Sequence, residues 1–323
     1  MSKPHLLLTT ELLEMKAEQL DAAFEVHRYY RAPDKAAMLA EVADKIEFVG
    51  CGGHSIRIDA DLIDQLPKLR IIANFGVGYD MVDTAKAAGR GIIVSNTPDV
   101  LTEEVADTAL GLLIMTVREL SQSEQYLRAG KWATDGDYRL SPQTLRDRSV
   151  GIIGLGRIGK AIAKRIEAFG MPVSYFGRTK QDGVNYSYYA SAVELAKNVD
   201  TLIVVTPGTA ETSKLVNGDV LAALGDRGIL INVARGSVVD EEALMQALKD
   251  RTIFAAGLDV MMNEPKINPE LMNIDNLVLL PHVGSGSVYT RAAMAQLAVD
   301  NLLACKQGEP PVTPVPETPF TSW

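Results

Sequence analysis

A glycine-rich segment, Gly154-Leu-Gly156-Arg-Ile-Gly159, has the residue types and spacing that bind the pyrophosphate of a dinucleotide. It follows the apolar run Ser149–Ile153 and opens an amphipathic stretch, which is the strand–turn–helix context that the motif requires. Gly154 permits the tight turn, Gly156 lets the backbone approach the phosphates, and Gly159 allows close helix–strand packing. The helix N-terminus adds amide donors and a positive dipole. A structural turn is the alternative, and we favour the dinucleotide site.

The residues after the next predicted strand, Val173–Phe176, indicate which dinucleotide is bound. NAD enzymes usually place Asp or Glu about 20 residues past the motif, where the carboxylate accepts hydrogen bonds from ribose hydroxyls. Gly177 stands there instead, so no carboxylate repels a 2′-phosphate. Arg178, Thr179 and Lys180 follow, and two cations and a hydroxyl can bind that phosphate. A solvated basic turn is the alternative. We predict NADP (NADPH), with NAD bound at lower preference.

Polar residues also follow other predicted strands of this region, at the point where each strand ends. Ligands bind outside the carboxyl ends of the strands in an open parallel sheet. One arginine, two carboxylates and one histidine therefore converge on the edge that holds the dinucleotide. They are Arg235, Asp259, Glu264 and His282, and Thr206-Pro207 ends a further strand at the same edge.

Arg235, Glu264 and His282 together have the chemistry to reduce a 2-oxo acid. Reduction needs a cation that holds the carboxylate and polarises the carbonyl, and a planar guanidinium suits both tasks. It also needs a proton donor for the developing alkoxide, and histidine is the best suited group near neutral pH. A carboxylate bonded to the other ring nitrogen would fix the tautomer, and Glu264 fits that role. The alternatives are a structural histidine and, for Glu264, a surface turn before Pro265.

Other chemistries lack their motifs in this sequence. There is no HExxH, no cysteine pair and no histidine cluster, which argues against a zinc-based alcohol dehydrogenase, and we predict no metal site. There is no GxSxG elbow for acyl transfer. The two cysteines, Cys51 and Cys305, are too far apart in sequence for a metal knuckle or redox motif.

Length and composition indicate a globular protein of two domains. The chain has 323 residues, of which 47% are hydrophobic and 23% charged, and domains average about 150 residues. Its net charge of −9 argues against a main role in binding nucleic acid or an anionic membrane. No apolar run approaches the ~20 residues needed to span a bilayer, and the first residues lack a signal-peptide pattern. We expect a cytoplasmic protein.

Short β-branched runs alternate with helical patterns along almost the whole chain, which predicts parallel sheets. The first series of predicted strands is His5–Thr9, Phe24–Tyr29, Ile46–Gly50, Arg70–Phe75 and Gly91–Ser95. The second is Ser149–Ile153, Val173–Phe176, Thr201–Val205, Gly228–Val233, Phe254–Leu258 and Asn276–Leu280. Predicted helices include Pro33–Ala43, Met81–Ala88, a long helix from an N-cap at Thr102 through Val117, and Ser287–Lys306.

Two segments fall outside this alternation. Between Glu119 and Arg148 the periodicity fades into a polar stretch with Tyr126, Trp132 and Tyr138. It is a surface arm or an arm that faces a partner, since exposed aromatics favour interfaces, and the two readings are equally supported. The proline-rich tail Glu309–Pro319 cannot be helical and is expected to be extended, with no function assigned.

Several spaced motifs resemble those of the D-2-hydroxyacid dehydrogenase family over nearly the whole chain. They are Asn74–Asp80, Asn96-Thr-Pro98, Gly154–Gly159, Asn232–Gly236, Gly257-Leu-Asp259, Glu264-Pro265 and Pro281-His282, in the family's order. Within the family the chain looks most like the NADP-dependent glyoxylate/hydroxypyruvate reductases and the hydroxyphenylpyruvate reductases. Arg178-Thr179 and the segment Val100–Asp107 point the same way.

The resemblance implies roles for individual residues. Arg235, Glu264 and His282 would be the catalytic set, and the backbone amides of Val77 and Gly78 would bind the substrate carboxylate. A simple strand-to-helix turn is the alternative for that loop. The remaining implied cofactor contacts are Gly154, Leu155, Gly156, Arg157, Ile158 and Gly159 along the pyrophosphate, Gly177, Arg178 and Thr179, Thr206 and Pro207 near the adenosine, Val233, and Asp259 near the nicotinamide. Further candidate substrate contacts are Ser285 and Gly52, in the loop Cys51-Gly52-Gly53-His54, where small glycines would leave room for a larger side chain. Plain turn chemistry is the alternative for that loop.

The resemblance also implies the architecture. The fold class is α/β, with two doubly wound parallel-sheet domains and a cleft between them. Residues 1–99 plus 286–323 would form a flavodoxin-like substrate-binding domain, and residues 100–285 a Rossmann NADP-binding domain. The family is usually homodimeric through the cofactor domain, which makes the arm 119–148 an interface candidate.

The leading hypothesis is therefore an NADPH-dependent reductase of small 2-oxo acids such as glyoxylate and hydroxypyruvate, with His282 as proton donor. A close alternative keeps the chemistry and changes the substrate to an aromatic 2-oxo acid such as hydroxyphenylpyruvate. A remote alternative is a nucleotide-sensing, corepressor-like binding protein, since this fold also serves that purpose. The presence of Arg235, Glu264 and His282 argues against it.

Overall fold

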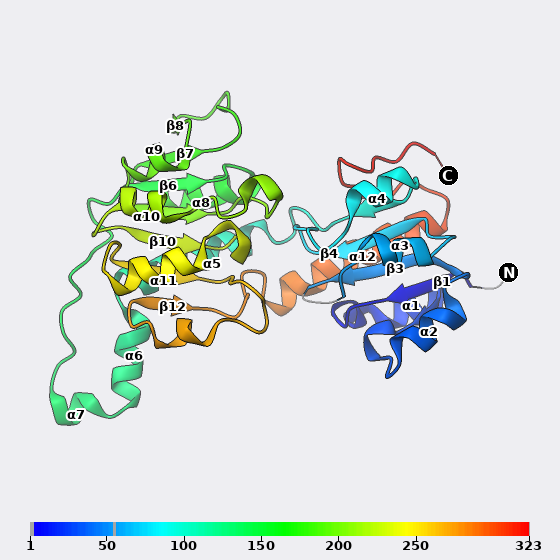
Figure 1. The fold of residues 1–323 in the computed structure, drawn as a ribbon, viewed down its shortest axis with the longest axis horizontal. Coiled ribbons are helices and arrows are strands. Elements are labelled where there is room, and N and C mark those ends of the chain that lie inside the picture. Colours follow the sequence, from blue (N-terminus) through cyan, green and yellow to red (C-terminus); the bar gives the residue numbers. More distant parts are fainter. Residues whose placement is uncertain (1–2, 54–55, 323) are drawn as a thin grey trace. The chain divides into compact units, whose positions relative to one another are not determined.

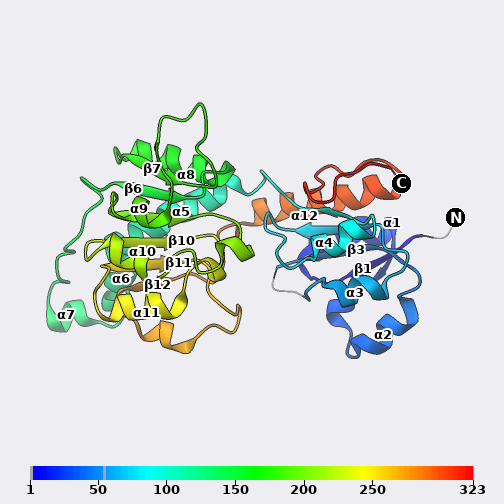
Figure 2. The same ribbon diagram turned by 45° about the horizontal axis from the view of Figure 1, so that its top comes forward.

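The computed structural model describes residues 3–53 and 56–322 (Figure 1). The chain divides into two compact units, the first formed by Met1–Leu101 with Ser287–Trp323 and the second by Thr102–Gly286. Each unit is a parallel sheet with helices on both faces, as the two views in Figures 1 and 2 show. The predicted fold class of two parallel-sheet α/β domains is confirmed.

The first unit contains a five-stranded parallel sheet among its described residues, in the order β2-β1-β3-β4-β5, which is the flavodoxin-like order. The strands are β1 His5–Leu8, β2 Glu25–His27, β3 Ile46–Gly52, β4 Ile71–Phe75 and β5 Ile93–Ser95. The helices are α1 Ala17–Ala23, α2 Lys35–Val42, α3 Ala60–Gln65, α4 Thr84–Gly89 and α12 Val288–Lys306, with 3-10 turns η1 Leu12–Lys16 and η2 Tyr29–Arg31.

Local sequence explains where these helices begin. The side chains of Asp34, Asp59 and Asp83 each accept a hydrogen bond from the first turn of α2, α3 and α4, respectively. Ser287 caps α12 in the same way. Helices α2, α3 and α4 cover one face of the sheet with apolar side chains such as Leu39, and α12 packs along β4 on the other face.

The second unit contains a seven-stranded parallel sheet, in the order β12-β11-β10-β9-β6-β7-β8. The strands are β6 Val150–Ile153, β7 Val173–Phe176, β8 Ser187–Tyr189, β9 Thr201–Val204, β10 Ile229–Asn232, β11 Ala255–Leu258 and β12 Leu277–Leu279. The helices are α5 Thr102–Val117, α6 Leu120–Arg128, α7 Lys131–Asp135, α8 Arg157–Ala168, α9 Ala192–Ala196, α10 Gly218–Leu224 and α11 Glu241–Lys249. Short 3-10 turns are η3 Ala210–Thr212, η4 Gly236–Val238 and η5 Pro269–Asn273.

This strand order contains the Rossmann order, and its direction reverses between β6 and β9. Helices α5 and α8 pack against each other on one face of the sheet, while α9, α10 and α11 cover the other. The strand interiors are buried on both faces, which explains their near-continuous apolar runs. Sheets of this kind bind ligands where the strand order reverses, so we expect a ligand at the carboxyl ends of β6 and β9.

The structure corrects several predicted details. Thr102 is the first residue of α5 rather than its N-cap, and Tyr29 begins a 3-10 turn rather than ending β2. Strand β8 was not predicted, because Ser187–Tyr189 is a short edge strand with no buried residue and so no apolar run. Between Glu119 and Arg148 the structure forms α6 and α7, which lack any buried side chain and so show no core-facing periodicity.

The tail after α12 forms no helix, as predicted, but it bends at Val312–Thr313 and turns at Pro316–Glu317 rather than being extended throughout. It lies along the edge strand β5, where Val315 N–H donates to Val94 O at 2.8 Å and Asn96 N–H donates to Thr313 O at 3.2 Å. Val315 itself is buried. The tail therefore covers backbone groups that an edge strand would otherwise expose.

Candidate active site

The glycine-rich turn between β6 and α8 has the geometry that a dinucleotide needs. Gly154 has φ +103°, and a Cβ on it would lie 3.0 Å from the Thr206 backbone. A Cβ on Gly159 would lie 2.2 Å from Gly154 O, whereas one on Gly156 would meet nothing within 4 Å. Gly156 is the N-cap of α8, and no side chain caps that helix. The open space at this helix N-terminus fits a pyrophosphate.

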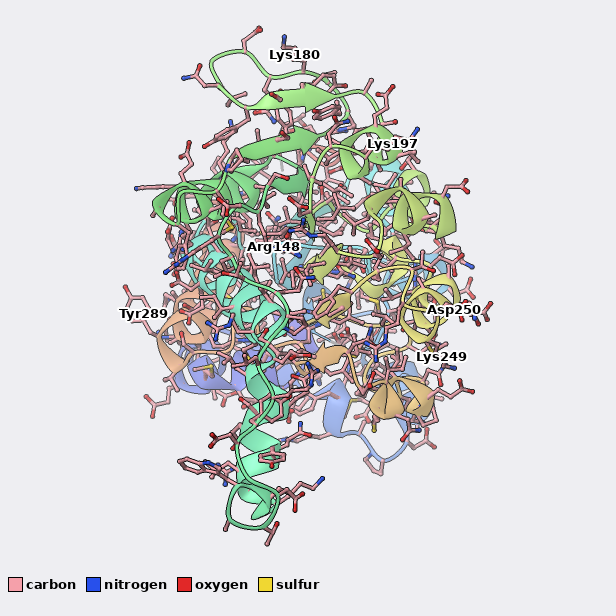
Figure 3. All side chains as sticks on the ribbon, turned by 90° about the vertical axis from the view of Figure 1, so that its left-hand side faces the viewer. Arg148, Lys180, Lys197, Lys249, Asp250 and Tyr289 are labelled. Atoms are coloured by element: carbon pink, nitrogen blue, oxygen red, sulfur yellow. The ribbon has the colours of Figure 1, made fainter. Side chains whose placement is uncertain are left out.

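The turn after β7 carries the cations predicted to distinguish NADP from NAD. Gly177 is half-buried, and Arg178, Thr179 and Lys180 are exposed. Figure 3 shows Lys180 on the segment between β7 and β8, at the outer edge of this sheet. Among the described residues Arg178 forms no hydrogen bond or ion pair, although its charge acts on the exposed Glu211 carboxylate. The turn therefore fits a phosphate on the adenosine ribose.

A residue that the sequence did not single out connects these two turns. Gln181 Nε2 donates to Leu155 O at 2.7 Å, and Gln181 N–H donates to Tyr175 Oη at 2.7 Å. Gln181 thereby holds the turn at Gly177 against the glycine-rich turn. No short motif could have revealed it, because the contact joins positions 26 residues apart.

Arg235 follows β10 and begins η4 in an extended conformation. Its Nη1 donates to Ala234 O at 2.8 Å, and Asn232 Nδ2 donates to Arg235 O at 3.0 Å. The arginine side chain lies across Gly208, where a Cβ would come within 2.9 Å of Arg235 Cγ. Gly208 thus leaves room for the guanidinium at the carboxyl edge of the sheet.

Glu264 and His282 form a hydrogen-bonded pair at the same edge. His282 Nδ1 lies 2.7 Å from Glu264 Oε2. The second carboxylate oxygen, Glu264 Oε1, accepts the Met261 N–H at 2.6 Å. The Glu264 side chain is only 11% exposed and that of His282 is 32% exposed, so the carboxylate is fixed while the imidazole reaches solvent. The surface-turn interpretation of Glu264 does not describe this buried, doubly bonded side chain.

Asp259 holds the backbone that carries His282. Its Oδ1 accepts the Val283 N–H at 2.7 Å and its Oδ2 accepts the Gly284 N–H at 2.8 Å. Its main-chain oxygen accepts the His282 N–H at 2.9 Å. His282 has φ +53°, in the left-handed region. Burial raises the pKa of the Asp259 carboxyl, and the two backbone donors act in the opposite direction.

A close backbone approach brings the Arg235 turn next to the Glu264 turn. A Cβ on Gly236 would lie 2.1 Å from the Met261 carbonyl group. Gly236 follows Arg235, and Met261 donates to Glu264. The structure thus gathers the three predicted catalytic residues on neighbouring turns at the carboxyl edge of β10, β11 and β12.

In the first unit, the carbonyl groups of the turn after β4 accept hydrogen bonds from two asparagine side chains. Asn74 Nδ2 donates to Gly76 O at 3.1 Å and to Gly78 O at 3.0 Å, and Asn96 Nδ2 donates to Val77 O at 2.9 Å. Because C=O and N–H point in opposite directions in a trans peptide, the Val77 and Gly78 amides face the other way. Among the described residues neither amide donates a hydrogen bond. Such a pair of free amides forms an anion-binding concavity.

The structure places the other predicted contacts as follows. Gly52 ends β3 at φ +139°, and a Cβ there would lie 2.4 Å from Phe75 O, which gives this glycine a packing role of its own. Thr206 packs on Gly154, and Val233 is buried with its N–H donating to Val204 O at 3.1 Å. Pro207 is exposed and Ser285 is buried. His54 lies outside the described residues.

The described part of the chain holds neither a metal-binding cluster nor a membrane-spanning helix. No group of three or more His, Cys, Asp or Glu side chains within residues 3–53 and 56–322 is arranged to hold a metal ion. Over the same residues, no helix combines the length and apolar character that a bilayer span requires.

Comparison with known proteins identifies the family. Residues 110–284 match the family described as "D-isomer specific 2-hydroxyacid dehydrogenase, NAD binding domain". The chain belongs to the D-2-hydroxyacid dehydrogenase family, and it is an NAD(P)-dependent dehydrogenase of that type. The resemblance found in the sequence motifs is confirmed.

Among similar proteins is a hydroxyphenylpyruvate reductase of Plectranthus scutellarioides, 47% identical over 92% of this chain and 94% of its own length. A glyoxylate/hydroxypyruvate reductase A of Arabidopsis thaliana is 46% identical over 92% of this chain and 94% of its own. A solved structure of an NADPH-dependent glyoxylate/hydroxypyruvate reductase of Sinorhizobium meliloti, in complex with NADP and malonate, is 49% identical with a TM-score of 0.92. It covers 100% of this chain and 99% of its own. These relatives support reduction of 2-oxo acids.

Proposed function

We propose that this protein reduces small 2-oxo acids such as glyoxylate and hydroxypyruvate with NADPH. The observation that carries the proposal is the His282 Nδ1–Glu264 Oε2 pair at 2.7 Å, on the turn next to Arg235 and at the edge that suits a dinucleotide. Residues 100–285 serve as the cofactor domain in this proposal, and residues 1–99 plus 286–323 as the substrate domain.

The substrate is bound through its carboxylate and its keto oxygen. The free Val77 and Gly78 amides bind the carboxylate, and Arg235 supplies a charge-assisted hydrogen bond that also polarises the carbonyl. Gly52 and Ser285 are further proposed substrate contacts. When bound, the nicotinamide supplies the hydride that forms the new C–H bond at the keto carbon.

His282 supplies the proton that the keto oxygen takes up. Glu264 accepts a hydrogen bond from Nδ1–H, which leaves the Nε2–H of the imidazolium to donate its proton to the developing alkoxide. The Nε2 proton is transferred, and the neutral imidazole is then reprotonated from solvent, which its 32% exposure allows. Since His282 must be protonated to donate, the reduction rate falls as the pH rises.

Gly177, the Arg178-Thr179 pair and a relative solved with NADP support NADPH as the preferred cofactor. Gly177 removes the carboxylate that would repel a 2′-phosphate, and Arg178 and Thr179 stand beside it. The glycine-rich turn, Leu155 to Ile158, receives the pyrophosphate. Thr206 and Pro207 would lie near the adenosine, Asp259 would lie near the nicotinamide, and Val233 would be a further cofactor contact. The Sinorhizobium meliloti relative with NADP supports the same choice.

A second candidate is reduction of aromatic 2-oxo acids. The Plectranthus scutellarioides relative, a hydroxyphenylpyruvate reductase 47% identical to this chain, favours it. The two candidates share the proton donor and the carboxylate site and differ only in the volume available to the substrate side chain.

Initial rates with glyoxylate, hydroxypyruvate and phenylpyruvate, each with NADPH and then NADH, test these proposals. Fast NADPH turnover of the two small acids is expected. A preference for phenylpyruvate would move the assignment to the aromatic candidate, and a preference for NADH would refute the role given to Arg178. No turnover of any 2-oxo acid, with NADPH still bound in a fluorescence titration, would refute the proposed reaction.

We also propose a cytoplasmic homodimer. Both cysteines are free and buried, which suits a reducing compartment. The arm 119–148 extends away from the sheet of the second unit (Figure 1) and exposes Leu127, Trp132 and Leu140, at 54%, 60% and 92%. Such large apolar side chains suit an interface with a second copy. Light scattering during gel filtration tests it, with a monomer for a W132A/L140A variant as the expected contrast.

A further inference from the structure

The tail after α12 contacts more than the edge strand it covers. Thr318 and Val315 bond to Val94 in the middle of β5, with Val94 N–H donating to Thr318 Oγ1 at 2.8 Å. Those contacts cover the edge of the sheet. Two other tail residues, Thr313 and Glu317, reach the turn whose free amides face away from Asn74 and Asn96.

Thr313 acts on this turn through Asn96. Thr313 Oγ1 donates to Asn96 O at 2.6 Å, and Asn96 N–H donates to Thr313 O at 3.2 Å. Asn96 Nδ2 in turn holds Val77 O at 2.9 Å. This last bond sets the plane of the peptide whose other end is the Gly78 N–H. Thr313 is itself held by Asn301 of α12, with bonds of 2.9 Å in both directions.

Glu317 acts on the same turn from its other end. Tyr79 follows Gly78, and its hydroxyl donates to the two Glu317 carboxylate oxygens at 3.2 and 3.0 Å. Burial and this hydrogen bond raise the pKa of Tyr79 to about 12, so the phenol remains a donor at any physiological pH. The turn between the Asn96 and Glu317 contacts is glycine-rich, with Gly76 at φ +146°. Because glycine is conformationally free, such a turn needs external contacts to keep one conformation.

We propose that the tail is a positioning clamp for the carboxylate-binding turn: Thr313 acts through Asn96, and Glu317 acts through Tyr79. The proposal rests on the proposed role of the Val77 and Gly78 amides. Since the clamp sets where these amides point and touches no group that moves a proton, its loss weakens substrate binding and leaves the chemical step intact.

Steady-state kinetics of tail variants separate clamping from edge covering. Thr313→Val and Glu317→Ala are expected to raise the KM for glyoxylate by about three- to tenfold each, the range of a single lost hydrogen bond, with kcat within about twofold. Glu317→Gln, which keeps an acceptor for Tyr79, is expected to stay near the parent KM. Tyr79→Phe is expected to match Glu317→Ala, and the double variant to add little to either.

Thr318→Val is the matched control, because it removes a tail contact to β5 that does not lead to the turn. It is expected to lower the Tm without changing the KM. If Thr318→Val raises the KM as much as Glu317→Ala does, or if Glu317→Ala leaves the KM unchanged, the clamp is refuted. Glu317 is exposed, so its variants fold even if Thr313→Val does not.

Hydrogen exchange gives a readout that does not depend on turnover. The Gly76 N–H, which donates to Thr97 Oγ1 at 3.0 Å, is expected to exchange faster in Glu317→Ala than in the parent chain, while Thr318→Val affects only residues around Val94. Unchanged exchange at Gly76 would overturn the clamp even if the enzyme reduces 2-oxo acids. If the exchange is faster but the protein turns over no 2-oxo acid, the proposed function is refuted. The tail would then hold the turn without a role in substrate binding.

Discussion

The residues proposed to move a proton and those proposed to bind the carboxylate are built from different chemical groups. At the carboxyl edge of β11 and β12, two carboxylates, Asp259 and Glu264, fix a histidine. After β4, backbone amides do the binding, and the neutral side chains Asn74 and Asn96 fix the turn. The first region holds charged side chains in place for chemistry. The second orients peptide dipoles, which bind an anion without titrating.

The largest expected effect comes from removing the proton donor. His282→Asn keeps a residue type that tolerates the left-handed backbone at φ +53° but cannot donate as an acid. We expect kcat for reduction to fall about 10²- to 10⁴-fold, with NADPH affinity by fluorescence titration unchanged. A variant that keeps its kcat would show that His282 is not the proton donor.

A smaller effect is expected from Glu264→Gln, which keeps an acceptor for Nδ1 but loses the charge that stabilises the imidazolium. The expected result is a fall in kcat of about tenfold or more. The kcat of the parent and of the variant, measured under the same conditions, tests this. An unchanged kcat would make Glu264 a packing residue.

The two regions also differed in how much of them the sequence predicted. Charged groups at strand ends, such as Arg235 and His282, were found because the residue types themselves indicate the chemistry. The glycine-rich turn was found because each glycine answers a steric requirement. The strands other than β8 were predicted to within a few residues, because buried apolar runs are recognisable in the sequence.

What the sequence did not reveal depends on contacts between distant residues. The bond from Thr313 to Asn96 joins positions 217 residues apart, and neither residue type indicates a role. The same holds for Gln181 and for the tail, which has a composition typical of a linker. Helices α6 and α7 were missed because they are short and polar and bury no side chain in a core.

The cofactor preference is a further case in which we expect charged side chains, rather than backbone amides, to decide binding. A Cβ at Gly177 would meet only Thr179 O, at 3.9 Å, so the position accepts a side chain. Gly177→Asp places a carboxylate next to the proposed 2′-phosphate, and the KM for NADPH is expected to rise about tenfold or more while that for NADH falls. Gly177→Ala, which adds bulk without charge, is the control and is expected to keep the NADPH preference. Equal behaviour of both variants would mean that shape, not charge, selects the cofactor.

The smallest effect is expected at Cys51, which contacts Asn74 next to the turn that carries the Val77 and Gly78 amides. Cys51 is fully buried and its Sγ lies 3.8 Å from Asn74 Oδ1, on the residue that holds Gly76 and Gly78. Burial raises the pKa of the thiols of Cys51 and Cys305 to about 12, so about 10⁻⁴ of each is thiolate at pH 8. We expect the native protein to react slowly with a thiol reagent at pH 8, faster as the pH rises, and at both sites at once in urea.

Cys51→Ala removes that weak contact and is expected to change the KM for glyoxylate by less than about twofold, since a thiol is a weak donor. Fast labelling of Cys51 in the native protein, with Cys305 still protected, would show that β3 and β4 open next to the turn. The amides of Val77 and Gly78 would then be held less firmly than the buried carboxylates at His282. In that case the substrate would have to order this turn on binding, at a cost to affinity that the proton-donating pair does not incur.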